Sequence, residues 1–497
     1  MSAAVDQRTG SGAQERRERD LLSRVPTGLF VGGRWRGTQR SVDVEDPATG
    51  AVLTSVADAE PADGADALDA AATAQRGWAR TPARERAEVL RRAYEAVVAR
   101  TEDFALLMTL EMGKPLAQAR GEVAYGAEFL RWFSEEAPRL AGRYADNPAG
   151  GSRLLTSKRP VGPVLAITPW NFPLAMGTRK VAPALAAGCT VVLKPATQTP
   201  LTSLLLAQVL AEAGVPDGVV NVVTTTRTRE VTGPLVADPR LRKLTFTGST
   251  PVGRQLVRQS ADRLLRVSME LGGNAPFLVF DDADLDAAVE GAVLAKMRNT
   301  GEACTAANRF LVQRGVAEEF TRRLADRLAA MPVGRGTEEG VEVGPLVDAR
   351  ARDDVAARVR EAVDAGARVL TGGGPVGERG WFYAPTVLTD VPAGARLLTE
   401  ETFGPVAPVG VFDTEEEALA RADDTEYGLV AYVFTESLRR GLRVADELDT
   451  GMVGLNAGIV STAAAPFGGV KASGFGREGG AEGIEEYLET KYVGIGL

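Results

Sequence analysis

Short apolar segments alternate with helical patterns between residues 162 and 313 of this chain. Apolar runs of this length are typical of strands buried on both faces, and the helices between them supply the crossovers that parallel strands need. The first series predicts strands at 162–167, 190–193, 219–223 and 243–247, with helices at 178–187 and 202–213. The second series predicts a strand at 276–280, a helix at 284–298 and a strand at 309–313. The fold class that this pattern indicates is α/β, with two doubly wound domains.

The regions outside these two series have patterns of their own. Residues 63–140 carry apolar side chains at three- and four-residue spacing, which indicates a helical layer. Residues 150–160 alternate weakly between polar and apolar, as an exposed hairpin does, and the apolar segment 487–495 is expected to add a strand to a neighbouring sheet. Residues 1–25 begin with a charged stretch that has no apolar core, so we expect a disordered or extended tail and no signal peptide.

Composition narrows the classes of protein. With 497 residues, 44% of them hydrophobic, the chain is long enough for two or more buried cores. Its formal net charge of −9 argues against nucleic acid or an anionic membrane surface as a general partner. The apolar runs fall far short of the ~20 residues that span a bilayer, so we expect no membrane segment. Two cysteines are too few for a disulfide framework, and we expect a reducing, cytoplasmic location.

Cys304 is the candidate nucleophile, in a chain that has no histidine. It follows a predicted helix and Gly301, so its thiol is expected at a turn where backbone N–H groups face an adjacent site; the alternative is a small buried apolar residue. Without histidine, the base has to be a carboxylate, a lysine or a water. Zinc sites with histidine ligands and Ser-His relays are excluded, and we expect no metal. The other cysteine, Cys189, enters an apolar strand and is expected to be structural and inert.

Two polar residues in short turns are the candidate partners of this thiol. Glu270 precedes Gly272 and Gly273, where the backbone is able to approach a neighbour closely, so it is the candidate general base; the alternative is a solvated loop glutamate. Asn171 lies between two prolines that restrict the backbone, so its amide is placed to stabilise a developing oxyanion. The alternative for Asn171 is a rigid turn in which the side chain bonds its own backbone.

Two further segments follow predicted strands and are candidates for contacts with a coenzyme. Gly248 and Ser249 follow the strand at 243–247 and open a helix, whose N–H groups and dipole favour a diphosphate. The glycine spacing does not match the dinucleotide fingerprint, so by itself this segment is only a helix start. Lys194 ends the strand at 190–193, a position suited to ribose or phosphate contacts, with a solvated surface lysine as the alternative.

Together these segments resemble the aldehyde dehydrogenase superfamily from about Phe30 to the C-terminus. The matching segments, in chain order, are Pro169-Trp170-Asn171-Phe172-Pro173, Lys194-Pro195-Ala196, Phe246-Thr247-Gly248-Ser249, Glu270-Leu271-Gly272-Gly273, the Cys304 segment, Glu400-Glu401-Thr402-Phe403-Gly404-Pro405 and Pro466-Phe467-Gly468-Gly469. The resemblance implies a non-standard Rossmann cofactor-binding domain at 26–149 and 162–271 and a catalytic domain at 272–477. It also implies a small β oligomerisation flap at 150–161 and 478–497, with homodimers or homotetramers as the usual assemblies.

The resemblance further implies a role for each matching residue. Cys304 would attack the aldehyde carbon while Asn171 and the Cys304 backbone N–H hold the oxyanion. After hydride transfer to the nicotinamide, a water activated by Glu270 would hydrolyse the thioester. Glu401 would bind the nicotinamide ribose, Phe403 would pack near the ring, and Lys194 would bind the adenosine ribose. The coenzyme contacts that the resemblance implies are those of Thr168, Pro169, Trp170, Lys194, Thr197, Gly248, Ser249, Glu401 and Phe403.

Three more segments resemble succinate semialdehyde dehydrogenases: Thr178-Arg179-Lys180, Met297-Arg298-Asn299 and Asn456-Ala457-Gly458-Ile459-Val460-Ser461. In those enzymes two arginines and a serine bind the far carboxylate of the substrate, which here implies Arg179, Arg298 and Ser461. Guanidinium groups suit this role because they stay charged and pair bidentately with carboxylates. The alternative for Arg298 is a helix-end arginine that faces solvent or pairs with an acidic neighbour.

We therefore expect oxidation of succinate semialdehyde to succinate. Glutarate semialdehyde or another aldehyde is the nearest alternative, because one methylene changes the binding energy by only ~1–3 kcal/mol. From other classes, the alternatives are a catalytically silent structural or binding protein and a cysteine hydrolase that acts on esters.

Three positions depart from common family patterns. Thr197 stands where many NAD-preferring relatives carry a glutamate that would repel a 2′-phosphate, so we expect NADP to be accepted and preferred over NAD. Glu302 replaces a frequent glutamine two residues before the nucleophile, and a carboxylate facing the thiol would raise its pKa. Either Glu302 points away, or the enzyme works best at higher pH. Ala306 stands where some relatives carry a second cysteine, which excludes a regulatory disulfide of that type.

Overall fold

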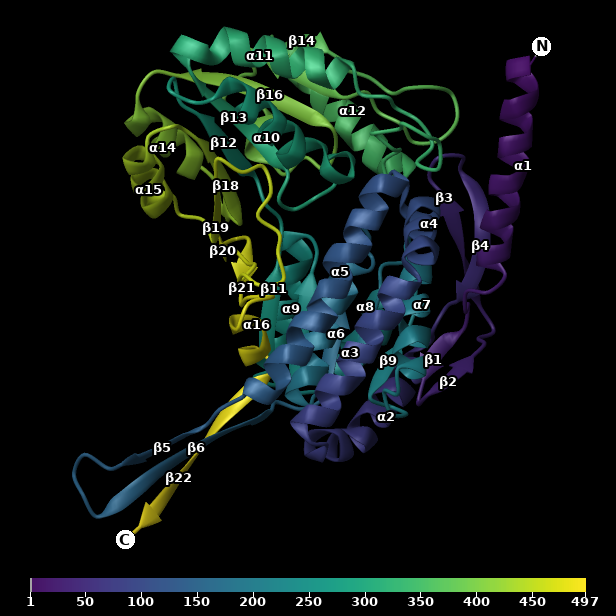
Figure 1. Ribbon diagram of the computed structural model, residues 1–497, viewed down its shortest axis with the longest axis vertical. Coiled ribbons are helices and arrows are strands. Elements are labelled where there is room, and N and C mark those ends of the chain that lie inside the picture. The colour runs from purple at the N-terminus through teal and green to yellow at the C-terminus, as the bar shows by residue number, and fades with distance from the viewer. Residues whose placement is uncertain (1) are drawn as a thin grey trace.

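The first sheet forms the lower half of the molecule in Figure 1, a computed structural model that describes residues 2–497. It has eight strands, in the order β2 (Arg34–Arg36), β1 (Leu29–Val31), β9 (Val220–Val222), β8 (Val191–Lys194), β7 (Val164–Ile167), β10 (Lys243–Thr247), β11 (Arg266–Glu270) and β21 (Gly474–Phe475). The five strands from β9 to β11 are parallel to one another. The apolar segments of the first series therefore form a parallel sheet, as predicted.

The connections of this sheet reverse direction between β7 and β10. From β7 the chain steps outward through β8 to β9, then returns to place β10 and β11 on the other side of β7. In open α/β sheets, ligands bind at the carboxyl ends of strands where such a reversal occurs. Residues 168–171 follow β7 and residues 248–249 follow β10, so two of the predicted site segments meet at this point.

Helices cover both faces of the first sheet. Along β7, Val164 and Ala166 pack into one hydrophobic cluster, while Leu165 and Ile167 pack into another on the opposite face. The helices that contribute mainly to the first cluster are α3 (Ala83–Ala99), α4 (Thr101–Met112), α5 (Leu116–Glu136), α6 (Ala175–Ala187) and α7 (Pro200–Glu212). Those of the second are α2 (Pro61–Arg80), α8 (Thr228–Ala237) and α9 (Thr250–Ala261). The predicted helical layer at 63–140 is thus confirmed as α2 to α5, with the short 3-10 helix η1 (Ala137–Arg139) at its end.

The second sheet has seven strands and lies above the first in Figure 1. Its order is β14 (Arg368–Thr371), β15 (Thr386–Thr389), β16 (Val406–Phe412), β13 (Ala307–Gln313), β12 (Ala275–Val279), β18 (Val430–Phe434) and β19 (Met452–Leu455). All neighbours are parallel except β14 and β15. Helices α10 (Leu285–Met297) and α11 (Arg314–Ala329) pack on one face, α14 (Glu415–Asp423) and α15 (Leu438–Glu447) on the other, and α12 (Ala349–Asp364) and α13 (Arg396–Thr399) near β15. Two doubly wound α/β units follow, as expected.

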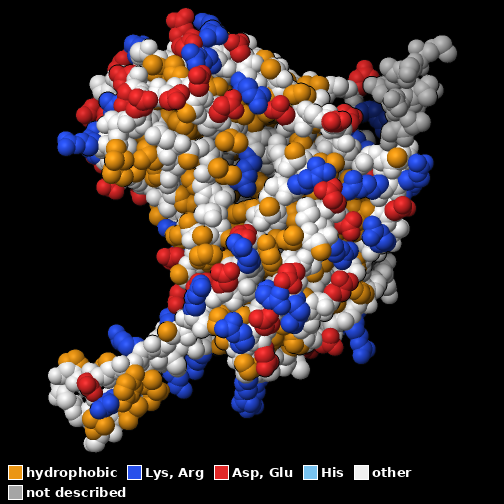
Figure 2. Space-filling model, in the orientation of Figure 1, with side chains coloured by type: hydrophobic (Ala, Val, Ile, Leu, Met, Phe, Trp, Pro, Cys, Tyr) orange, Lys and Arg blue, Asp and Glu red, His pale blue; other side chains and the backbone are white. Residues whose placement is uncertain are grey.

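A three-stranded flap projects from the body, with the C-terminus at its tip (Figure 1). It consists of β5 (Arg143–Asp146), β6 (Ser152–Pro160) and β22 (Leu488–Gly496), all antiparallel, and β22 follows the short helix α16 (Glu482–Glu485). The expected start of this flap at residue 150 is too late, because β5 already pairs with β6. Figure 2 shows hydrophobic side chains gathered on the flap. Tyr144 of β5 and Tyr492 and Ile495 of β22 are exposed.

Several short strands complete the connections between the units. They are β3 (Ser41–Asp46) with β4 (Ala51–Ala57), and β17 (Tyr427–Gly428) with β20 (Val470–Lys471). The expected catalytic segment 272–477 also returns to the first sheet, because Gly474 of β21 pairs with Glu270 of β11. The chain therefore crosses between the two units twice near the predicted base.

The prediction of a disordered or extended tail at residues 1–25 is wrong over Ser2–Leu22, which forms helix α1. Its end is docked on the body: Leu21 is fully buried, and both terminal nitrogens of Arg335 bond Glu18, at 3.0 and 2.9 Å. The charged residues of this segment suggest a solvated tail, but Arg335, far away in the chain, neutralises Glu18. No helix within residues 2–497, α1 included, is both long and apolar enough to cross a membrane.

Candidate active site

The loop that carries Cys304 is held in an unusual backbone conformation. Between α10 and Cys304 lies the 3-10 segment η2 (Arg298–Gly301), in which Asn299 and Thr300 have φ of 55° and 56°. This left-handed region costs energy for residues other than glycine, so neighbouring groups have to hold it. They do: the Asn299 backbone N–H donates to Oε1 of Gln118 at 2.6 Å, and its side-chain amide donates to the Asn171 carbonyl at 3.0 Å.

Two glycines allow the end of β11 to pass against this loop. A Cβ at Gly273 would lie 2.4 Å from the carbonyl oxygen of Cys304, and a Cβ at Gly272 would lie 2.7 Å from Oε2 of Glu401. Close backbone approach is therefore the reason for Gly273, while Gly272 leaves room for the Glu401 carboxylate. The Gly273 N–H also donates to Oε1 of Glu401 at 2.7 Å. The structure thus brings Glu270, Cys304 and Glu401, predicted from three separate segments, to one place.

Glu270 has an enclosed environment that raises the pKa of this candidate general base. Its side chain is buried, and neither carboxyl oxygen has a hydrogen-bond partner among residues 2–497. Burial, and then the nearby Glu478, raise the pKa of the Glu270 carboxyl well above its ordinary value. The alternative of a solvated loop glutamate is wrong. A carboxyl group with free oxygens is able to accept a proton from a water once it has lost its own.

The Cys304 thiol is protonated at rest. Burial raises the pKa of this thiol to about 12; Arg179 and Arg298 oppose the shift, while Glu401 and Glu270 add to it. A thiolate then has to form in the presence of ligands. Cys189 differs in being fully enclosed, with the pKa of its thiol raised to about 11 by burial, as expected for an inert structural residue.

Glu302 points away from the nucleophile, which answers one question that the sequence leaves open. Its Oε1 accepts the backbone N–H of Val347 at 3.0 Å, and burial raises the pKa of its carboxyl well above the ordinary range. Its backbone carbonyl instead faces the site, where it accepts the side-chain amide of Asn171 at 3.1 Å.

Asn171 shows both of the arrangements considered for it. Its Oδ1 accepts the backbone N–H of Phe172 at 3.1 Å, which is the local turn, while its amide nitrogen is directed at the Cys304 loop. Lys114 donates to the Asn171 carbonyl at 2.8 Å and forms a buried ion pair with Glu122. Asn171 is therefore held on both sides beside the nucleophile, and its oxyanion role stays a prediction.

Arg298 and Ser461 come together in a small cavity beside this loop. Nη1 of Arg298 donates to Oγ of Ser461 at 3.0 Å. The cavity has a volume of about 210 Å³, below the ~300 Å³ at which typical ligand pockets begin, so it suits a short substrate. Its lining also includes Lys114, Gln118, Gly121, Glu122, Tyr125, Phe172, Asn299 and Ile459.

Arg179 lies elsewhere than the sequence alone suggests. Its Nη2 forms an ion pair with Oε2 of Glu478 at 2.6 Å, its guanidinium stacks 3.9 Å from the ring centre of Phe467, and it does not line this cavity. Glu478 also pairs with Lys180, which donates to Oγ1 of Thr247 at 2.7 Å. Substrate binding by Arg179 stays a prediction. Sequence reasoning missed Glu478, because a glutamate between Arg477 and Gly479 carries no signal until its burial is known.

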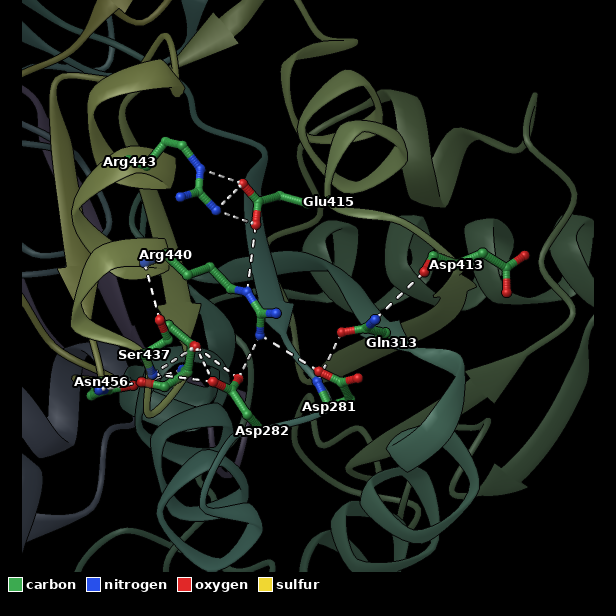
Figure 3. A network of polar contacts seen from close by, with 10 residues as sticks. Asp281, Asp282, Gln313, Asp413, Glu415, Ser437, Arg440, Arg443 and Asn456 are labelled. Carbon is green, nitrogen blue, oxygen red and sulfur yellow. Dashed lines mark hydrogen bonds and ion pairs between the residues drawn. The ribbon is translucent and has the colours of Figure 1, made fainter.

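A polar network anchors the loop that carries Ser461 (Figure 3). Asn456 has φ of 51°, and its amide bonds both the N–H and the carbonyl of Thr435, at 3.0 and 2.9 Å. The Thr435 hydroxyl donates to Asp282, which Arg440 binds at 2.7 Å. The same loop lies flat against α10, since a Cβ at Gly458 would meet the backbone of Gly291 at 2.2 Å. These contacts hold the start of the loop that carries Ser461 in a defined position.

The predicted coenzyme residues line the edge where β7 and β10 end. Lys194 is 6% exposed, and burial lowers the pKa of its ammonium to about 8, which leaves a donor suited to an anionic or hydroxyl ligand. Ser249 precedes α9 without bonding its N–H groups, so that helix end is open to a phosphate. The rings of Trp170 and Phe403 meet edge to face at 5.9 Å. These groups fit a nicotinamide dinucleotide.

Comparison with known proteins identifies the class. A model of the aldehyde dehydrogenase family matches residues 35–493, and the chain belongs to this family and is an oxidoreductase. Two crystal structures superpose on nearly the whole of this chain. An E. coli NADP dependent enzyme has a TM-score of 0.94 at 48% identity, covering 95% of this chain and 98% of that one. Betaine aldehyde dehydrogenase from Staphylococcus aureus, in complex with NAD+, has a TM-score of 0.93 at 32% identity, covering 96% of each chain.

Two relatives whose names give a substrate also match most of the chain. The succinate-semialdehyde dehydrogenase of Paenarthrobacter nicotinovorans is 62% identical over 444 residues, covering 89% of this chain and 99% of that protein. The glutarate-semialdehyde dehydrogenase of Pseudomonas aeruginosa is 50% identical, covering 94% of this chain and 97% of that protein.

Proposed function

We propose that the chain oxidises succinate semialdehyde to succinate with NADP or NAD. The observation that carries this proposal is the pairing of Arg298 with Ser461 in a cavity next to the nucleophile loop. A guanidinium and a hydroxyl on one wall suit a carboxylate at the far end of a short aldehyde. The names of two similar relatives, both succinate-semialdehyde dehydrogenases, support the same substrate class.

In this proposal each residue of the site has a defined task. Cys304 adds to the aldehyde carbon to give a thiohemiacetal, and the Asn171 amide stabilises the oxyanion. Bound NAD(P) supplies the hydride acceptor. Glu270, in its carboxylate form, takes a proton from the water that attacks the thioester, and the Cys304 sulfur leaves as the acid forms. The free oxygens of Glu270 support this step, because nothing else among residues 2–497 competes for them.

NADP is the coenzyme that we propose to be preferred. Thr197 carries no charge, and its hydroxyl donates to the Thr225 carbonyl at 3.1 Å, so it offers no repulsion to a 2′-phosphate. Lys194, three residues earlier in the chain at the end of β8, is the residue that we propose to supply the cation for this phosphate. Introducing Thr197→Glu should shift the ratio of kcat/KM from NADP toward NAD; an unchanged ratio, or a large NAD preference in the unmodified enzyme, would contradict this.

We also propose that the flap pairs subunits into a homodimer or homotetramer. The exposed aromatic and aliphatic side chains of β5 and β22 support this, since an apolar surface on a projecting element needs a cover. Light scattering after size-exclusion chromatography would test it, and a monomer at micromolar concentration would refute it.

The substrate is tested by comparing kcat/KM for succinate semialdehyde, glutarate semialdehyde and butanal. We expect the first to be preferred, and Arg298→Ala to reduce activity on the two acids much more than on butanal. Glutarate semialdehyde is the second candidate, because a relative at 50% identity acts on it by name. Equal losses on acids and butanal would remove the reason to propose a carboxylated substrate.

A further inference from the structure

The Tyr125 hydroxyl is a buried group without an assigned task. Helix α5 places Tyr125 on the wall of the cavity that Arg298 and Ser461 share. The hydroxyl oxygen is buried and has no hydrogen-bond partner among residues 2–497. Leaving a buried hydroxyl unsatisfied costs ~1–3 kcal/mol, a cost that a ligand with an acceptor oxygen removes.

Tyr125 packs against Arg298 on the wall of the same cavity. The guanidinium carbon of Arg298 lies 5.6 Å from the Tyr125 ring centre and 4.7 Å from that of Phe172, so Arg298 contacts two rings. An anion bound by Arg298 within this cavity would therefore lie close to the Tyr125 hydroxyl.

The acidic residue of the same wall does not oppose an anion. Glu122 pairs with Lys114, and its Oε1 accepts the backbone N–H groups of Leu174 and Ala175 at 3.0 and 3.2 Å. The Glu122 carboxylate therefore already bonds Lys114 and the N-terminus of α6. The side chains of Lys114, Gln118 and Asn299 also line the cavity, and each bonds a backbone group of the protein. The Arg298 guanidinium and the hydroxyls of Ser461 and Tyr125 remain as the polar groups available to a ligand.

We propose that the Tyr125 hydroxyl donates a hydrogen bond to the distal carboxylate of the substrate, beside Arg298 and Ser461, and so selects carboxylated over neutral aldehydes. This inference rests on the proposed function. The Tyr125 ring and the hydroxyl have separable tasks: the ring orients Arg298, and the hydroxyl binds the ligand.

Tyr125→Phe tests the hydroxyl alone, because it keeps the ring. We expect KM for succinate semialdehyde to rise about tenfold or more, as for a lost hydrogen bond to a charged group, with a smaller change in kcat. The inhibition constant of succinate should rise in parallel, while kcat/KM for butanal stays unchanged. The matched control is Tyr94→Phe. The Tyr94 ring also contacts an arginine, with the guanidinium carbon of Arg131 at 5.9 Å from the ring centre, but it lies on a different surface. This variant should leave KM and kcat unchanged for both substrates.

The outcomes separate this inference from the proposed function. If Tyr125→Phe leaves KM and succinate inhibition unchanged while Arg298→Ala raises both, the Tyr125 inference is overturned and the proposed function stands. Equal losses on succinate semialdehyde and butanal would also overturn it, since they indicate a structural role. If the unmodified enzyme prefers butanal, the proposed function fails first. Thermal unfolding should show the variant as stable as the parent, because no bond within the protein is lost.

Discussion

The backbone N–H of Val347 donates to Oε1 of Glu302 at 3.0 Å. This hydrogen bond holds the Glu302 carboxyl group against the neighbouring loop that contains Val347. The groups that act most on the pKa of the Cys304 thiol, after burial, are Arg179, Glu401, Glu270 and Arg298. Glu302 contributes through its backbone carbonyl, which positions Asn171.

Glu302→Gln is therefore expected to leave the thiol unchanged. The rate of iodoacetamide reaction with Cys304 should rise with pH in the variant as in the parent, because the pKa of the thiol is raised to about 12 by burial in both. Glu270→Gln is the contrasting control: it removes a group that raises the thiol pKa, so its profile should shift to lower pH. A similar shift in Glu302→Gln would contradict the role assigned to Val347.

Glu270→Gln should separate the two halves of the reaction. We expect a rapid burst of about one reduced coenzyme per site in stopped-flow absorbance, followed by turnover slowed ~10²–10⁴-fold, since only thioester hydrolysis needs the base. The raised pKa of Glu270 means that its basic form grows as pH rises, so deacylation in the parent should accelerate with pH. Loss of the burst together with turnover, or a flat pH profile in the parent, would contradict this assignment.

The buried ammonium of Lys296 is expected to lower the free energy of unfolding while it interacts with Glu401 in the predicted coenzyme site. Its Nζ bonds Oδ1 of Asn308 at 2.7 Å in a fully buried position, and burial, opposed by Glu401, lowers the pKa of the ammonium to about 7. Between that value and its ordinary 10.5, the unfolded chain binds the extra proton, so the free energy of unfolding should rise with pH in this window.

Lys296→Met should reduce that pH dependence and raise KM for the coenzyme, because Glu401 loses its nearby cation. Urea unfolding across the window and coenzyme kinetics would measure the two effects. The variant Arg439→Met, at an exposed position of α15 outside the flap, serves as the control for the loss of a surface charge. A pH slope that survives in Lys296→Met would show that another group causes it.

Arg335→Ala should release α1. Arg335 bonds Glu18 through two nitrogens and Asp46 at 3.0 Å, so its removal leaves two largely buried carboxylates without their cation. We expect a loss of roughly 1–3 kcal/mol in the free energy of unfolding and faster tryptic cleavage within α1. The control is Arg314→Ala, which breaks an equally bidentate but exposed pair with Asp413 and should cost at most ~1 kcal/mol. Equal losses would indicate that the docking of α1 contributes nothing of its own.

The buried strands were predictable because their signal is local. The strand expected at 162–167 contains β7, Val164–Ile167, and its four side chains are apolar and buried. Such a segment has no polar face, so a short apolar run is sufficient to indicate it. The docking of α1 was not predictable, since its contact with Arg335 spans 317 positions and its sequence has few apolar residues between its charged and polar ones.

The order of residues by itself determined the class of chemistry: one reactive thiol, no histidine, a carboxylate between a strand and two glycines, and an asparagine between prolines. Only the tertiary structure decided how those groups are used. It paired Arg179 with Glu478 and left Arg298 facing the cavity with Ser461, and it turned Glu302 toward Val347. The physical reason is that pKa values and hydrogen-bond partners depend on burial and on groups far away in the chain, which local patterns do not encode.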